Sequence, residues 1–218
     1  ACLAGKGKVD LRGCRVLSED FFLWSGTGLQ SRLGSFFASK LLRGHVRKVA
    51  PADYPAPLQS PDFHGQVYRL ADLVLDVPSL VETLARRQQD AIFAIDWQHC
   101  ALQCEGRSAV LRLADCTVVP QQWLLTAGAG NAALLAQLQS GQPAMQSRPL
   151  QQVLVRHQYP EPFYGHCMGS NPSPRLTISS HRDQSGRPVW YLGGDLATAA
   201  AEEPAEALIE RARCELAE

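Results

Sequence analysis

The sequence lacks the features that mark membrane proteins and nucleic-acid-binding proteins. No apolar run approaches the ~20 residues needed to cross a bilayer, and no charged leader followed by an apolar run stands at the start. The chain has 21 Lys and Arg and 21 Asp and Glu, so its formal net charge is zero. A neutral chain offers no broad electrostatic attraction for nucleic acid or for a membrane surface. We therefore expect no nucleic-acid partner and no membrane span.

Disulfide and metal frameworks are not indicated either. The seven cysteines are an odd number and include no Cys-x-x-Cys pair, so a disulfide-stapled secreted fold is not expected. His99, Cys100, Cys104 and Cys116 are near one another in sequence, but neighbouring residues of a strand point to opposite faces. We therefore predict no metal site and a cytoplasmic location.

Common catalytic motifs are absent as well. The sequence has no Gly-x-Ser-x-Gly, no phosphate-binding Walker loop and no His-Glu-x-x-His, which argues against the usual hydrolases and nucleoside triphosphatases. Its 218 residues can form one large domain or two small ones. The first residue is alanine instead of methionine, so we expect a processed product or a piece of a longer chain.

The most informative stretch that is present runs from Trp123 to Leu138. A short apolar segment leads to a Gly-Ala-Gly turn and then to an Ala- and Leu-rich segment, which predicts strand, turn and helix. The glycines would let a ligand approach the backbone, and Asn131 could cap a helix whose first N–H groups bind an anion. The spacing from Gly128 to Ala133 fits a relaxed dinucleotide motif, but the acidic residue expected about 20 positions later is absent. A nucleotide-contacting turn and a plain strand-turn-helix unit both remain open.

Hydrophobic periodicity predicts the other elements. Strands are expected over residues 15–17, 66–70, 91–104, 109–119, 150–156, 163–168, 175–181 and 188–192, and helices over 29–43, 76–87 and 204–216. Either Asp76 or Ser79 can cap the helix that starts near residue 76. The proline-rich segment 50–65 is expected to be an extended connection, and 24–28 a loop.

Polar side chains concentrate in the β-rich third quarter of the chain. Tyr164, His166, Arg175 and His181 are the candidate substrate-binding residues, with His157, Tyr159 and Arg182 nearby. Tyr and His suit the orientation of a small polar molecule, and Arg suits a carboxylate or a phosphate. Ordinary exposed strand and loop positions would explain each of these residues singly.

Three segments together resemble FAD-dependent oxidoreductases of the D-amino-acid oxidase type, a group that includes glycerol-3-phosphate dehydrogenases. The first is the helix start Asp76-Val77-Pro78-Ser79-Leu80, followed by a hairpin and by residues 123–131. The second is the hairpin from Arg175-Leu176-Thr177-Ile178 to Tyr191-Leu192-Gly193-Gly194. The third, Leu23-Trp24-Ser25 with Phe36-Phe37-Ala38-Ser39-Lys40, is similar to a subgroup known only as FAD-dependent oxidoreductases.

The resemblance implies an α+β fold, in which a mixed β-sheet substrate domain accompanies part of a flavin-binding α/β domain. The implied parts are a helical and connecting segment (1–65), a partial FAD-binding domain with a hairpin (66–140), a β-rich substrate domain (141–195) and a C-terminal helix (196–218). FAD is the implied cofactor. Its implied contacts are Ala127, Gly128, Ala129, Gly130, Asn131, Gly193, Gly194 and Asp195.

This family opens with a strand, Gly-x-Gly-x-x-Gly and a helix, and no such segment precedes Trp24. The resemblance therefore implies the middle portion of an enzyme that oxidises a small amine or hydroxy substrate by hydride transfer to flavin, with no assigned catalytic residue. Two alternatives remain open. One is a non-catalytic fragment or interaction module that keeps the fold without the cofactor, and the other is a different kind of nucleotide-binding protein.

Overall fold

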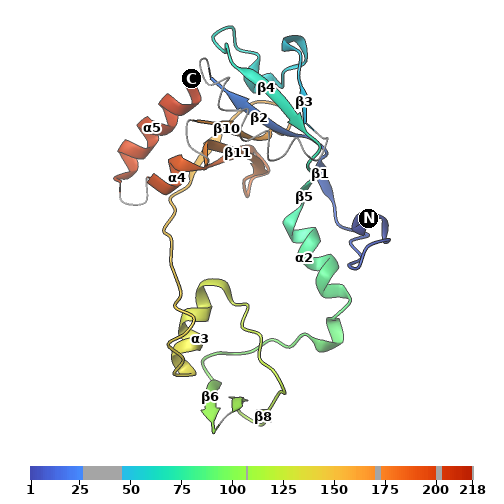
Figure 1. Ribbon diagram of the computed structural model, residues 1–218, viewed down its shortest axis with the longest axis vertical. Helices are drawn as coiled ribbons and strands as arrows, with labels where there is room; N and C mark the ends of the chain where they lie inside the picture. The colour runs from blue at the N-terminus through green and yellow to red at the C-terminus, as the bar shows by residue number, and fades with distance from the viewer. Residues whose placement is uncertain (27–45, 107, 170–172, 200–202, 218) are drawn as a thin grey trace. The chain divides into compact units, whose positions relative to one another are not determined.

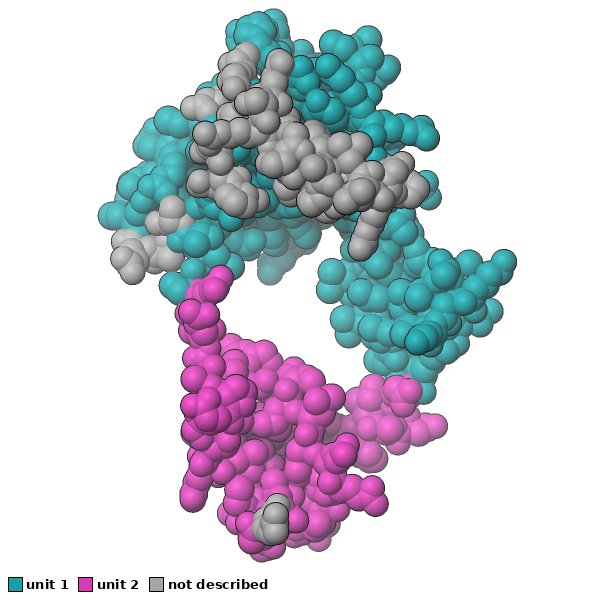
Figure 2. Space-filling model, in the orientation of Figure 1, with its two compact units in different colours: residues 1–87, 149–218 teal, residues 88–148 magenta. Residues whose placement is uncertain are grey.

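A computed structural model describes residues 1–26, 46–106, 108–169, 173–199 and 203–217. The helix predicted over 29–43 lies outside these residues. The chain forms two compact units, residues 1–87 with 149–218 and residues 88–148, which Figure 2 colours separately. We describe each unit by itself.

A seven-stranded mixed sheet forms the centre of the first unit (Figure 1). Its strands, in spatial order, are β3 (Val46–Lys48), β4 (Gln66–Leu70), β2 (Phe21–Ser25), β10 (Tyr164–Met168), β11 (Pro174–Arg182), β12 (Pro188–Gly193) and β9 (Val153–Arg156). Strands β2 and β10 are parallel, and every other pair is antiparallel. Together with the helices, this mixed sheet confirms the predicted α+β class.

One face of the sheet carries the main core. Along β11 the side chains of Leu176, Ile178 and Ser180 are buried, whereas Thr177 and Ser179, which alternate with them, are only half-buried, as alternation along a strand requires. Helix α4 (Asp195–Ala199) packs against β11 and β12, and α5 (Ala205–Ala217) packs against α4 and β9. The core cluster comprises Trp24, Leu58, Val67, Phe163, Cys167, Leu176, Ile178, Trp190, Leu192, Leu196, Leu208 and Ala212.

A smaller substructure of the same unit joins the N-terminal segment to α2 (Val77–Arg86). Strand β1 (Val16–Ser18) pairs with β5 (Val74–Leu75), directly before the helix. The side chain of Asp76 accepts a hydrogen bond from the Ser79 N–H at 3.1 Å. Asp76 is therefore the N-cap, which confirms one of the two predicted caps.

The second unit is built on a three-stranded antiparallel sheet. It contains β6 (Ala101–Glu105), β7 (Ser108–Arg112), β8 (Thr117–Val118) and α3 (Asn131–Gln137). Leu102, Leu111 and Leu134 form its buried centre. The hairpin of β6 and β7 confirms the predicted pairing, but β6 begins only at Ala101, because residues 91–99 before it are exposed. The second strand of the prediction, 109–119, is divided between β7 and β8.

The segment before the glycine turn is not the predicted strand. Trp123 and Leu125 pack against the core of the second unit, and Leu124 is 86% exposed. The Trp123 indole N–H donates to the Ala109 carbonyl at 2.8 Å, so a side chain, instead of a strand ladder, holds this segment. Gly128–Gly130 forms a 3-10 turn that leads into α3.

Two further predictions are wrong at the level of local structure. Asn131 does not cap α3; its side chain accepts from the Ala127 N–H at 2.8 Å and donates to the Leu125 carbonyl at 3.0 Å. Trp24 and Ser25 lie in β2 instead of a loop, because both pair with β4 and both are buried. The proline-rich segment contains two 3-10 turns, Pro51–Asp53 and Ala56–Leu58.

Candidate active site

A cavity of about 380 Å³ lies at the ends of β10 and β11 in the first unit. Tyr164 and His181, two of the four predicted substrate-binding residues, line it together with Arg182. The loop after β9 contributes His157 and Tyr159. The structure thus brings residues from three strand ends to one cavity, which is a common setting for binding a small molecule.

Burial controls the protonation states of the side chains that line this cavity. Tyr164 is 5% exposed, and burial, followed by the negative charge of Asp76, raises the pKa of its phenol. Burial also lowers the pKa of His157 and of His181. The cavity therefore presents a protonated phenol and neutral imidazoles at neutral pH, and these groups can exchange hydrogen bonds with a polar substrate.

The two histidines of the cavity are held in place by different contacts. His157 Nδ1 accepts a hydrogen bond from the Tyr159 N–H at 3.2 Å, and its ring stacks on Trp190 with 4.4 Å between centroids. His181 Nε2 lies 2.9 Å from Ser179 Oγ, and its ring is 4.2 Å from that of Tyr191. Their orientations are thus set before any ligand binds.

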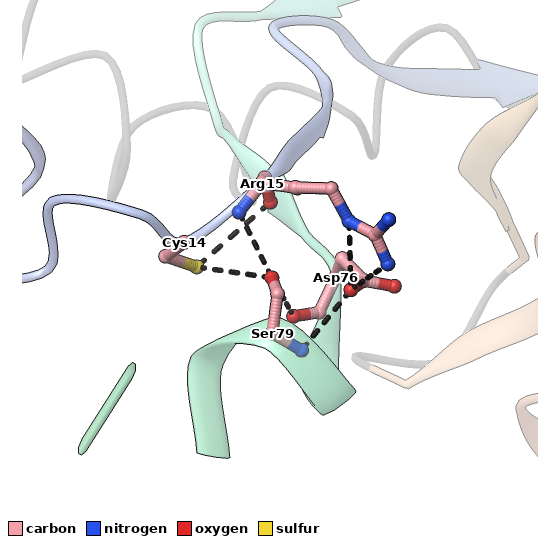
Figure 3. A network of polar contacts seen from close by, with 4 residues as sticks. All are labelled: Cys14, Arg15, Asp76 and Ser79. Carbon is pink, nitrogen blue, oxygen red and sulfur yellow. Dashed lines mark hydrogen bonds and ion pairs between the residues drawn. The ribbon is translucent and has the colours of Figure 1, made fainter. Parts of the chain in front are cut away.

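Asp76 belongs to the cavity although the sequence indicated only its capping role. Figure 3 shows the polar network around it. Arg15 forms an ion pair with Asp76 at 2.7 Å, and the Arg15 backbone N–H donates to Ser79 Oγ at 2.9 Å. The Ser79 hydroxyl in turn donates to the Asp76 carbonyl at 2.9 Å. The hydrogen bond from the Arg15 guanidinium is the main cause that lowers the pKa of Asp76, so the cavity rim holds a carboxylate.

The other two predicted substrate-binding residues lie outside this cavity. His166 Nδ1 is 2.9 Å from Thr177 Oγ1, and the ring meets Phe21 edge-on at 4.7 Å, beside a separate cavity of about 540 Å³. Arg175 points to helix α5, where its Nε lies 3.0 Å from a carboxylate oxygen of Glu215. The sheet register shifts between Cys167 and Met168, opposite Arg175, and this irregularity accompanies the turn of Arg175 toward the helix.

Strand register nevertheless groups His166 with the cavity residues. On the sheet face opposite the main core, Tyr164 pairs with Ser179 and His166 pairs with Thr177, and Ser179 also pairs with Tyr191. We call this face the polar strip, which comprises Tyr164, His166, Thr177, Ser179, His181 and Tyr191. The sequence predicted Tyr164, His166 and His181 as candidates, but it did not indicate Thr177, Ser179 and Tyr191, because the cross-strand order depends on the register.

The predicted cofactor contacts are divided between the units. Ala127 precedes the 3-10 turn Gly128–Gly130 in the second unit, and Ala127, Gly128, Ala129 and Gly130 are exposed. Gly128 has a positive φ of 56°, and a Cβ there would meet nothing within 4 Å. The turn is therefore open to a ligand, but it is not a complete phosphate cradle, because α3 has seven residues and the Asn131 side chain already binds Leu125 and Ala127.

Gly193, Gly194 and Asp195 join β12 to α4 in the first unit. Gly194 has a φ of 83°, and a Cβ would lie 2.6 Å from the Pro174 carbonyl oxygen. This close approach explains the glycine by packing alone. Gly193 is different, because it pairs with Thr177 of the polar strip and a Cβ there would make only an ordinary contact at 3.7 Å. Gly193 thus fits a ligand that covers the polar strip.

Neither a metal centre nor a membrane span is found in the part of the chain that the structure describes. Within these residues no three His, Cys, Asp or Glu side chains gather as metal ligands do. No helix in the same residues has the length and apolar character that crossing a bilayer requires. His99 instead pairs with Asp96, with 2.8 Å between Nδ1 and Oδ2.

Comparison with known proteins decides the relationship. No protein-family model matches the chain. A probable FAD-dependent oxidoreductase of Pseudomonas aeruginosa is 44% identical over 219 residues, which cover the whole chain and 56% of that protein. This chain is homologous to part of an FAD-dependent oxidoreductase. The resemblance predicted from the sequence is thereby confirmed.

Solved structures agree with this relationship. The crystal structure of an FAD-dependent oxidoreductase from P. aeruginosa matches with a TM-score of 0.79 and 38% identity, over the whole chain and 55% of that structure. Glycine oxidase from Geobacillus kaustophilus matches with a TM-score of 0.52 and 15% identity, over 82% of this chain and 48% of that structure, which shows a shared fold only. The chain therefore spans about half the length of the relatives that it matches.

Proposed function

We propose that this chain is the substrate-binding part of an FAD-dependent oxidoreductase that oxidises a small amine or hydroxy compound by hydride transfer to flavin. The observation that carries the proposal is the meeting of Tyr164 and His181 at a cavity that adjoins the polar strip. The homology to a probable FAD-dependent oxidoreductase supports the cofactor. Bound flavin supplies the hydride acceptor, and the protein supplies orientation and exclusion of water.

The cavity residues have distinct roles in this proposal. The Tyr164 phenol donates a hydrogen bond to the polar group of the substrate, since burial keeps it protonated. The His181 imidazole, held by Ser179 and Tyr191, fixes the position of the substrate beside it. His166 lies next to Thr177 on the polar strip, the face that a bound flavin would cover in this proposal. Arg175 is the exception, because its ion pair with Glu215 gives it a positioning role for α5.

The residues present fit part of an FAD site. Gly193, which pairs with Thr177 of the polar strip, would permit close approach of the flavin ring, with Gly194 and Asp195 next to it at the start of α4. Residues 127–131 form an open turn of the second unit, which we keep as a predicted FAD contact considered by itself. These contacts leave the ADP half of FAD without a phosphate cradle of its own, so that half requires other residues.

Flavin content and turnover test the proposal. The protein isolated from its natural source should be yellow. Under anaerobic conditions, addition of a small amine or hydroxy acid should bleach its flavin absorbance. Tyr164→Phe should raise KM about tenfold, as expected for one hydrogen bond to the substrate, while FAD remains bound. The matched control is Tyr54→Phe, which removes a phenol on the 50–65 segment that donates to the Gly65 carbonyl. A colourless protein that does not take up FAD would refute the proposal.

A non-catalytic role is the second candidate, because the Asn131 side chain is already hydrogen-bonded to the backbone N–H of Ala127 and α3 is short. In that case FAD should neither bind nor raise the melting temperature. If ADP or NAD raises it and FAD does not, a different nucleotide-binding function is indicated. A cytoplasmic location belongs to the main proposal, and the seven free cysteines support it.

A further inference from the structure

The two edges of the seven-stranded sheet differ in how they are protected against pairing with another chain. Strands β3 and β9 lie at the two ends of the sheet, so no strand of the described residues pairs with their outer sides. Strand β3 carries the exposed cations Arg47 and Lys48, and charges of this kind discourage pairing between chains. Strand β9 reads Val-Leu-Val-Arg, with neither lysine nor proline. The β9 edge is therefore the less protected of the two.

Hydrogen bonding at the end of β9 shows which of its backbone groups face outward. The His157 N–H donates to the Pro188 carbonyl at 3.3 Å, so residue 157 points toward β12. In an antiparallel pair, successive residues point alternately toward the neighbouring strand and away from it. The register between β9 and β12 is continuous, so the odd-numbered residues of β9 bond to β12 as well. The backbone N–H and C=O groups of Leu154 and Arg156 therefore point outward, where a further strand can bind them.

The side chains of β9 suit contact with an apolar strand. Val153 and Val155 pack against the main core cluster. Leu154 lies on the opposite face, that of the polar strip, and is 56% exposed. Arg156 is the one charged residue of β9, and its Nε lies 3.3 Å from a carboxylate oxygen of Asp183. The edge thus presents an exposed leucine, and its single charge already has a partner within the chain.

A second copy of β9 is complementary to this edge. In an antiparallel pair about a two-fold axis, each outward-facing residue lies opposite another outward-facing residue. If Leu154 lies opposite Leu154 of the second copy, the two exposed side chains meet on one face and Arg156 lies opposite Gln152. A shift of two residues places Leu154 opposite Arg156 or Gln152 and separates the leucines. The register centred on Leu154 therefore covers the leucines and places no like charges opposite each other.

We propose that β9 is a self-association edge, at which two copies of this chain pair antiparallel about Leu154 and join their sheets into one. Strand β9 has four residues, and a contact of this length is smaller than a standard protein interface. The association should therefore be weak and should depend on protein concentration. The proposal does not depend on the oxidoreductase function, since no flavin or substrate contact enters it.

Sedimentation and amide hydrogen exchange of the 218-residue chain test this pairing together. Sedimentation should show a reversible monomer–dimer equilibrium between about 10 µM and about 1 mM protein. The amides of Val153 and Val155 should exchange slowly at every concentration, because they bond to β12. The amides of Leu154 and Arg156 should exchange rapidly in the dilute protein and slowly in the concentrated protein. This pattern distinguishes pairing through β9 from association through another surface.

Leu154→Pro is the most specific variant, because proline removes an outward N–H and leaves the N–H groups that bond to β12 in place. It should weaken dimerisation at least about tenfold, since a symmetric pair loses two hydrogen bonds. Leu154→Lys guards against a folding defect of the proline variant. It keeps the backbone N–H but places like charges opposite each other at the two-fold axis, and it should also weaken dimerisation.

Leu124→Lys is the matched control, because it makes the same change at a leucine that is 86% exposed and lies outside the sheet. It should dimerise as the unmodified chain does. The proposal is overturned if the chain stays monomeric over the whole concentration range, or if it dimerises while the amides of Leu154 and Arg156 still exchange rapidly. It is also overturned if both Leu154 variants dimerise as tightly as Leu124→Lys.

Discussion

Arg15 and Asp76, 61 residues apart in sequence, form an ion pair with 2.7 Å between Arg15 Nη2 and Asp76 Oδ2. Asp76 also caps helix α2 and lines the proposed substrate cavity. The same carboxylate thus caps the N-terminus of a helix, holds the N-terminal segment and helps to raise the pKa of Tyr164. Ser79 completes this arrangement, because its hydroxyl binds the backbone of both Arg15 and Asp76.

Ser79→Ala should destabilise the first unit by about 1–2 kcal/mol, since it leaves the Arg15 N–H and the Asp76 carbonyl without their side-chain partner. Ser79 is 8% exposed, so water cannot readily replace the hydroxyl. Urea denaturation followed by circular dichroism measures the change. Ser147→Ala, at an exposed loop position, is the matched control and should leave stability unchanged. Equal midpoints for the two variants would contradict the role of this network.

Local chemistry explains which elements could be predicted from the sequence. Two candidate caps, Asp76 and Ser79, and a proline in the first turn located α2, and the strand-like composition of residues 66–70 located β4. The segment from Trp123 to Ala127 has strand-like composition, but its conformation is set by contacts with Ala109 and Asn131. Such contacts leave no periodic signal in the sequence.

The candidate site was predictable in residue type but not in arrangement. Tyr164 and His181 meet because β10 and β11 are antiparallel neighbours, whereas the parallel pairing of β10 with β2 joins segments about 140 residues apart. Alternation alone would place Arg175 on the same face as Thr177. The register shift opposite Arg175 breaks that rule, and the ion pair with Glu215 holds the side chain on the helix side.

Asn131 offers a test that separates a structural role from a cofactor contact. Asn131→Ala removes the bonds to Ala127 and Leu125 and should destabilise the second unit by about 1–2 kcal/mol. Asn131→Asp keeps the acceptor for the Ala127 N–H but loses the donor to Leu125, so its effect should be smaller. Hydrogen exchange of the amides in α3 and β6 measures both. If the variants lower only FAD affinity and leave exchange unchanged, the side chain serves the cofactor instead.

Gly194 and Gly186 make a matched pair for packing at the β12 end. Both have positive φ, 83° and 76°, but a Cβ at Gly186 meets nothing within 4 Å, whereas one at Gly194 would lie 2.6 Å from the Pro174 carbonyl oxygen. Gly186→Ala should destabilise by about 1 kcal/mol, the left-handed backbone penalty alone. Gly194→Ala should destabilise by about 3 kcal/mol, because steric overlap is added. Chemical denaturation measures the free energy of unfolding of the two variants. Similar values would show that the backbone of β11 moves away from the added Cβ at no cost.

Acid should weaken the first unit through His157. Burial lowers the pKa of this imidazole below its ordinary value of 6.5, so the unfolded chain binds a proton more readily than the folded chain does. The stability that the neutral imidazole contributes is fully present above about pH 6.5. It decreases as the pH falls from that value toward the pKa of the folded chain. Protonation at Nδ1 would also remove the acceptor of the Tyr159 N–H and so release the loop that lines the proposed substrate cavity.

His157→Gln isolates this contribution, because glutamine keeps a hydrogen-bond acceptor and does not titrate in this range. Urea midpoints at about pH 7.5 and about pH 5.5 should differ more for the unmodified chain than for His157→Gln. The pKa of His181 is lowered for the same reason, so His181→Gln is the comparison, and the double variant should be the least sensitive to pH. If His157→Gln retains the full decrease in stability between the two pH values, the imidazole stacked on Trp190 is not the group that titrates.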